Sequence, residues 1–465
     1  MKNYSPFILF LFFLISCKSE PTRVYDLQIS NVQLIDLETG QLDTMDIYID
    51  EGKIVSVQKA EEQTGPEVSK RIDATGKYAL PGFWDNHVHF RGGDSLIADN
   101  KKFLNLFLAN GITTVRDAGG DLTNNVMDWK AQINEGKIDG PTIFTSGPKI
   151  DGPNATWAGS LEVENDSDIE NALDSLQNIP VDFVKLYDSK ISGPSYIKTI
   201  EAAENRGMIT SGHMPFTVTL NETIDAGIDA VEHLYYIMKG ASADEFAITE
   251  KLKNQEIGFW DAMPLLQNSY SDSAAASTFE KLKINSVFVV PTLHIGRTLS
   301  YLDEVDHTND PYLKYMSPGI QKTYQGRIDR VKNASEKAVK DRKELDRFFG
   351  RLTYTLHKAG VSLLAGSDSG AYNSYTYPGI SLHQELEALV ATGIAPLDAL
   401  RTSAYHGAEF LKKQEGYGTI RNGKIADIVL LNTNPLTDIK NTKDLYMVIK
   451  EGSVYAEKEL KKLLD

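Results

Sequence analysis

Two histidines stand at alternate positions, His87 and His89 in the sequence DNHVHF, and imidazoles with this spacing can ligate a metal ion. Side chains alternate along a β-strand, so a strand here would project both imidazoles from the same face. Two converging imidazoles form half of a metal site. The pair is weak evidence alone, so its meaning depends on where other metal-ligating residues fall.

Four further polar residues lie at or near the ends of apolar, strand-like runs. They are Lys185 in FVKLYD, His213 in TSGHMP, His233 in VEHL and Asp368 in AGSDSG. The strands of a (β/α)8 barrel all end at one mouth, so residues far apart in the sequence can converge there. Burying such groups without a cation or polar partners would cost several kcal/mol. We therefore expect the six residues to converge at the mouth, where a cation or polar partners would satisfy them.

The middle of the chain contains the elements that would position these residues. Eight apolar runs alternate with amphipathic helical stretches: ALPGFWDNHVHF, GITTVRDAGG, PTIFTSG, VDFVKLYD, MITSGHM, AVEHL, VFVVPTL and VSLLAGSD. Nearly continuous apolar strands are typical of a parallel sheet that is buried on both faces. The pattern predicts an α/β fold with a (β/α)8 TIM-type barrel over residues 79–414. Helical insertions at about 240–286 and 294–360 follow strand ends, and we expect them to cover the mouth.

Both ends of the chain have a sequence pattern that is typical of a small β-domain. Residues 18–78 and 415–465 contain short alternating runs, with Glu51-Gly52 and Glu451-Gly452 at the positions of tight turns. We predict one β-sandwich domain assembled from both segments.

Composition narrows the classes of function and of metal ligand. The 465 residues carry a formal net charge of −16, which would repel a phosphate backbone and argues against nucleic-acid binding. Cys17 is the only cysteine, so the sequence allows neither an intramolecular disulfide nor a thiolate cluster. Nitrogen and oxygen ligands favour zinc, with manganese, iron or cobalt as alternatives.

The first 17 residues are typical of a signal peptide. Lys2 precedes the nine-residue apolar run 7–15, which is too short for a membrane-spanning helix of about 20 residues. The following LISC resembles the bacterial lipobox, whose cysteine is acylated. The resemblance implies lipidation at Cys17 and a lipid-anchored protein of the bacterial cell envelope, at the outer membrane and facing the periplasm or the surface.

Taken together and in order, the motifs resemble those of the amidohydrolase superfamily, within it the imidazolonepropionase-like and Xaa-Pro dipeptidase-like branch. The motifs are PGFWDNHVHF, GITTVRDAGG, DFVKLYD, GHMPFTVTLNETIDAGIDAVEHL, AGSDSG, LHQELEALVATGIAPLDALRTSA and GKIADIVLLNTNP. The resemblance implies that His87, His89 and Asp368 bind one divalent ion. It implies that His213 and His233 bind a second, with a carbamate on Lys185 bridging the two.

This ligand set implies a hydrolase. Water held by two zinc ions would become hydroxide near neutral pH and attack a carbonyl carbon, while Asp368 moves the proton to the departing nitrogen. The expected activity is cleavage of an amide, cyclic amide or dipeptide C–N bond, with a dipeptidase favoured. The alternatives are a mononuclear, imidazolonepropionase-like ring hydrolase or deaminase, in which Lys185 is dispensable, and a binding protein without catalysis. The sequence leaves open whether the chain forms a homo-oligomer.

Residues that contact substrate are less sharply indicated. Tyr236, three residues after His233, matches a tyrosine often found at that offset in this branch, and it could support an oxyanion or hold the substrate. His294 and Arg297 follow the seventh strand, where a cation could bind a substrate carboxylate; a structural role in the insertion is the alternative. Arg116 and Asp117 are interpreted as a buried ion pair that shapes the mouth.

Overall fold

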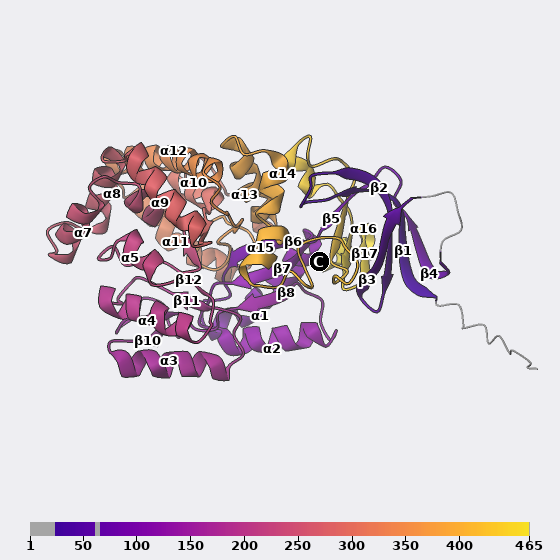
Figure 1. The fold of residues 1–465 in the computed structure, drawn as a ribbon, viewed down its shortest axis with the longest axis horizontal. Coiled ribbons are helices and arrows are strands. Elements are labelled where there is room, and N and C mark those ends of the chain that lie inside the picture. Colours follow the sequence, from indigo (N-terminus) through magenta and orange to yellow (C-terminus); the bar gives the residue numbers. More distant parts are fainter. Residues whose placement is uncertain (1–23, 61–65, 465) are drawn as a thin grey trace, which may run out of the picture.

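The computed structural model describes residues 24–60 and 66–464, in which a β-domain adjoins a larger α/β barrel (Figure 1). The proposed signal segment and Cys17 lie outside the described residues. Among the described residues, no helix has the length and apolar character needed to cross a bilayer.

Strands from both ends of the chain form the β-domain, as the sequence predicts. They are β1 (Tyr25–Ile35), β2 (Leu42–Asp50), β3 (Lys53–Lys59), β4 (Val68–Asp73), β5 (Tyr78–Pro81), β15 (Ile428–Leu431), β16 (Leu445–Lys450) and β17 (Ser453–Ala456). Their order is β17-β16-β15-β5-β1-β2-β3, with β4 beside β1. Residues 51–52 and 451–452 all have positive φ and close the β2–β3 and β16–β17 hairpins, so both predicted tight turns are present. Aliphatic side chains such as Ile29, Ile47 and Ile449 form the core of this domain.

Seven short, buried strands line the barrel. They are β6 (Phe83–Val88), β7 (Ile112–Asp117), β8 (Thr142–Thr145), β11 (Val184–Leu186), β12 (Thr210–Gly212), β13 (Ala230–Glu232) and β14 (Phe288–Val290). The eighth predicted strand is reduced to single bridges, which join Leu363 to Val289 and Ser369 to Val88. Since these bridges link the segment to β14 and to β6, it closes the barrel. Two short strands, β9 (Ile150–Asp151) and β10 (Leu161–Glu162), extend the sheet beside β11.

Helices surround the strands. The barrel helices and the C-terminal helices are α1 (Ile97–Ala109), α2 (Thr123–Asn134), α3 (Asp166–Asn178), α4 (Gly193–Asn205), α5 (Leu220–Asp225), α6 (Tyr235–Gly240), α13 (Ile380–Ala391), α14 (Pro396–Arg401), α15 (Ala404–Phe410) and α16 (Glu457–Leu463). The insertions hold α7 (Glu245–Lys253), α8 (Phe259–Asn268), α9 (Asp272–Ile284), α10 (Leu293–Ser300), α11 (Pro318–Lys332) and α12 (Glu336–Lys358). The insertion helices gather at the end of the molecule away from the β-domain (Figure 1).

Candidate metal centre

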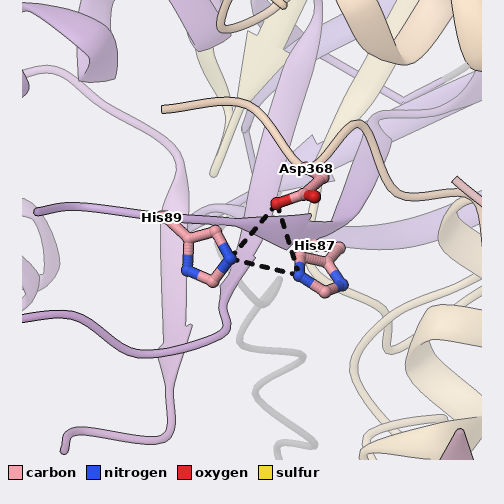
Figure 2. A group of neighbouring side chains, drawn as sticks. All are labelled: His87, His89 and Asp368. Carbon is pink, nitrogen blue, oxygen red and sulfur yellow. Dashed lines mark hydrogen bonds and ion pairs between the residues drawn. The ribbon is translucent and has the colours of Figure 1, made fainter. Parts of the chain in front are cut away.

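His87, His89 and Asp368 converge at the mouth of the barrel (Figure 2). The His87 Nε2 and His89 Nε2 atoms lie 3.2 Å apart, and the Asp368 Oδ1 atom is 3.6 Å from the first and 3.2 Å from the second. All three residues are buried. We refer to this group as the inner triad.

The backbone fits Asp368 closely against β6. The Asp368 N–H donates to the His87 carbonyl at 2.7 Å, and the His89 N–H donates to the Ser369 carbonyl at 2.9 Å. A Cβ at Gly366 would lie 2.5 Å from the His87 Cβ, so only glycine permits this approach. Asp368 itself has φ 54, a left-handed conformation that is costly for a residue with a side chain.

His213 and His233 form a second group, the outer pair, at the ends of β12 and β13. Their Nε2 atoms are 3.1 Å apart. Both side chains are partly exposed, and both line a cavity of about 340 Å³. His233, like Asp368, has positive φ, here 67. Two of the described residues in this unfavourable conformation therefore sit at the proposed site.

Each of the four imidazoles is oriented through its Nδ1 atom. The partners are Glu232 Oε2 for His87 (2.5 Å), the Gly119 carbonyl for His89 (2.8 Å), Asp188 Oδ1 for His213 (3.2 Å) and Thr292 Oγ1 for His233 (2.7 Å). Metal-binding histidines are usually held in this way, with one ring nitrogen bound to a second residue and the other free to ligate. The arrangement leaves the Nε2 atoms of each group facing one another, 3.2 Å apart in the inner triad and 3.1 Å apart in the outer pair.

Burial favours the neutral form of three of the histidines, His87, His89 and His233, and ligation requires that form. Burial lowers the pKa of His87 and lowers the pKa values of His89 and His233 well below the usual value. Burial alone would raise the pKa of Asp368, but the nearby His87, His89 and His233 hold it well below its ordinary range. Neutral imidazoles beside an ionised carboxylate are a donor set that suits a divalent cation such as zinc. The residues present therefore fit a metal at the inner triad.

Lys185 lies in a fully buried charge cluster beside the triad. Its Nζ atom is 3.3 Å from Glu232 Oε1, which also lies 3.0 Å from the Arg116 guanidinium. The Lys185 ammonium forms no hydrogen bond with any described residue that meets ordinary geometry. Burial lowers the pKa of Lys185 to about 8, against the opposing effect of Glu232. About a tenth of this lysine is consequently an uncharged amine at pH 7, far more than for a lysine with an ordinary pKa.

The predicted ion pair between Arg116 and Asp117 is absent. Arg116 instead pairs with Glu232, and Asp117 accepts a hydrogen bond from Thr145 Oγ1 at 2.7 Å. Consecutive residues of a strand point to opposite faces, which separates the two side chains. Glu232 was missed by the sequence reasoning, although it directly precedes His233.

Tyr236 reaches the cavity from α6 and connects to the outer pair. Its hydroxyl donates to Asp188 Oδ2 at 2.7 Å, and the other oxygen of Asp188 contacts His213. Tyr236 is thus placed beside the mouth, where it can position both Asp188 and a bound substrate.

The cationic residues of the cavity differ from those that the sequence suggests. His294 and Arg297 do not line it, because the residues of α10 that line the cavity are Ile295, Gly296 and Leu299. The His294 backbone N–H binds Glu385, and the Arg297 side chain is exposed. Arg91 and Arg327 line the cavity instead.

Both of these arginines are held by neutral groups. Arg91 Nε donates to the Ala371 carbonyl at 2.9 Å, and its guanidinium stacks 4.2 Å from the Trp157 ring centroid. Arg327 Nη2 donates to Asn373 Oδ1 at 2.6 Å, and Asn373 in turn donates to Asp368 Oδ1 at 2.7 Å. No carboxylate among the described residues lies within 4.0 Å of either guanidinium. Two cations therefore face the cavity with charge free for an anion.

Comparisons with known proteins agree with this geometry. Residues 332–455 match the model of the amidohydrolase family. An adenine deaminase of Desulforamulus reducens is 28% identical over 206 residues, which span 40% of this chain and 31% of that enzyme. The chain thus covers about a third of the length of this curated relative.

Two solved structures share the fold over nearly the whole chain. One is an Xaa-Pro dipeptidase with methionine bound in its active site, with a TM-score of 0.68, 18% identity and coverage of 92% of this chain and 99% of that one. The other is a bottromycin amidohydrolase, with a TM-score of 0.74, 20% identity and coverage of 94% and 88%. The fold over nearly the whole chain is therefore the one seen in these two structures, and residues 332–455 are similar to the amidohydrolase family.

Proposed function

We propose that the protein is a metal-dependent hydrolase that cleaves the C–N bond of a small amide ending in a carboxylate, with a dipeptide as the favoured substrate. The observation that carries this proposal is the convergence of four Nδ1-anchored histidines and Asp368 beside a cavity lined by two unpaired arginines. The fold of the Xaa-Pro dipeptidase supports the choice of substrate.

The inner triad would hold a divalent cation, which supplies an activated water and polarises a carbonyl when it is bound. Asp368 is ionised, so it can accept the proton of the attacking water and return it to the departing nitrogen. Arg91 and Arg327 can each offer parallel N–H groups to a substrate carboxylate, which fixes the direction in which a dipeptide lies. Tyr236 can orient the substrate through its contact with Asp188.

A second cation, held by the outer pair, is part of the proposal. A carbamate on Lys185 would supply an anionic ligand between the two histidine groups. Carbamylation requires an uncharged amine, and the lowered pKa of the buried Lys185 supports this chemistry. We propose zinc for both positions because the donor atoms are nitrogen and oxygen.

One observation favours a mononuclear alternative. The ion pair between Lys185 and Glu232 gives the lysine a partner without a carbamate. A ring hydrolase or deaminase with one metal would use the inner triad alone, and the adenine deaminase similarity is consistent with this alternative.

A screen of dipeptides and cyclic amides with zinc-loaded protein tests the proposed function. Release of the C-terminal residue from Xaa-Pro or related dipeptides would support it. Deamination of a purine without dipeptide cleavage would favour the mononuclear alternative, and full activity after chelation would contradict both.

We also propose that acylated Cys17 anchors the protein in the cell envelope. The support is the sequence LISC after the apolar run 7–15. Cys17→Ser should move the protein from the membrane fraction to the soluble fraction without changing its catalytic constants. Continued tight membrane association of that variant would contradict the anchor.

A further inference from the structure

The cavity at the metal centre continues into a groove between the insertion helices. A second hollow of about 200 Å³ shares Tyr235, Trp260 and Arg327 with the first. A third hollow of about 460 Å³ shares Trp260, Arg330 and Arg342 with the second. We call the second and third hollows together the insertion groove.

One wall of the insertion groove is basic. Arg330 on α11 and Arg342 on α12 line both of its hollows, and no carboxylate of the described residues lies within 4.0 Å of either. The Nε and Nη2 atoms of Arg342 are shielded from solvent and lack hydrogen-bond partners among the described residues. A buried donor without a hydrogen bond is costly, so these N–H groups are suited to bind an acceptor on a ligand.

The acidic residues of the groove do not neutralise this wall. Asp341 binds Lys337 at 2.5 Å, and Glu344 lies 3.7 Å from Lys340. Asp346 is the one acidic residue of the described chain that lines the second hollow, where three arginines also lie. The lining of the second hollow is therefore positive, in a protein whose net charge is −16.

The groove also has an apolar lining. Trp260 is 59% exposed, an unusual position for an indole, and it lines the third hollow together with Met263 and Leu345. An extended chain with a charged end could pack its methylene groups on this surface while its end contacts the arginines.

From this arrangement we infer that the protein prefers substrates that extend away from the scissile amide and end in an anionic group. Arg330 and Arg342 hold this group. The substrate class is an N-acylated or N-extended dipeptide with a second carboxylate. This inference rests on the proposed function for the position of the scissile bond. The groove is built by the helical insertions, so it would add specificity without changing the metal ligands.

A matched pair of compounds tests this inference. N-succinyl-alanyl-proline and N-butanoyl-alanyl-proline differ only in a terminal carboxylate in place of a methyl group. For the zinc-loaded protein, we expect kcat/KM to be about tenfold higher for the succinyl compound, the size of one charge-assisted hydrogen bond. Reduced-amide analogues of both, which cannot be cleaved, should show the same ratio in Kd by titration calorimetry.

Variants locate the effect. Arg342→Gln should remove the preference while leaving kcat/KM for alanyl-proline unchanged, and Arg330→Gln should reduce it. Arg347→Gln is the matched control, because Arg347 is an exposed residue of α12 that lines neither hollow. Equal binding of both analogues to the wild type, or a preference that survives Arg342→Gln, would overturn the inference. Discrimination in Kd without cleavage of either parent compound would support the groove and contradict the proposed hydrolase.

Discussion

The inner triad and the outer pair use the same imidazole chemistry in different surroundings. His87, with its side chain fully buried, is oriented by Glu232, whose carboxylate also faces two cations. His213 and His233 are partly exposed, and their Nδ1 partners Asp188 and Thr292 also line the cavity. The inner triad is thus the more deeply buried group, with His87 held entirely by the barrel core, although His89 and Asp368 line the same cavity as the outer pair.

The difference in burial between the two groups should affect how tightly each binds a metal ion. Buried ligands with buried partners lose little entropy when a metal binds, because their orientation is already fixed. Ligands at a cavity wall are open to solvent and to substrate. We therefore expect the inner position to bind metal more tightly than the outer position.

Removal of an inner ligand should have the largest effect. His87→Ala should lower kcat/KM by about a thousandfold or more, which corresponds to about 4 kcal/mol of transition-state stabilisation, and should empty the inner position. Metal content by plasma mass spectrometry and dipeptide hydrolysis check this. A variant with full activity and full metal content would contradict the assignment.

Substitution of Lys185 should affect the outer metal position and not the inner one. Lys185→Ala should retain the inner metal, lose the outer one and lower kcat by about a hundredfold, or about 2.7 kcal/mol. Short-chain carboxylic acids should restore part of the activity by replacing the carbamate. Unchanged metal content, with no response to added acids, would favour the mononuclear alternative.

Glu232 tests whether the buried partner matters to the inner triad. Glu232→Gln should lower metal affinity by about 10- to 100-fold, because the His87 ring loses its anionic acceptor. Competition with a chelator measures the affinity. The unpaired Arg116 should also lower the free energy of unfolding, so thermal melting is measured alongside. Unaltered metal affinity would show that Glu232 serves only to balance charge.

Substitution of Tyr236, which lines the cavity, should have the smallest effect on kcat/KM. Tyr236→Phe should lower kcat/KM by about tenfold through loss of its hydroxyl, a change of about 1.4 kcal/mol, while both metals remain bound. Tyr235→Phe is a neighbouring control. A loss of metal in Tyr236→Phe would instead assign Tyr236 to the support of His213 through Asp188.

The fold and the convergence of the six candidate residues followed from strand patterns. The (β/α)8 barrel and the composite β-domain are confirmed, and the structure brings Lys185 and the four histidines to the same mouth as Asp368. Arg91 also had a signal, since it continues the alternation of His87 and His89.

Other parts of the site depend on tertiary contacts that no local pattern encodes. Arg327 enters the cavity because α11 packs over the mouth, and its contact with Asn373 joins segments 46 positions apart. His294 and Arg297 do not line the cavity, because α10 contributes Ile295, Gly296 and Leu299 to it instead. The packing of α11 over the mouth and the face that α10 turns to the cavity both depend on contacts between distant segments.

The most direct test of the central claim is the metal content of the purified wild-type protein, prepared with zinc and bicarbonate and then dialysed against a graded series of chelator concentrations. The account predicts about two zinc ions per chain, released in two steps, with loss of activity accompanying the first. A protein that binds no zinc, or that hydrolyses dipeptides fully after both are removed, would contradict it.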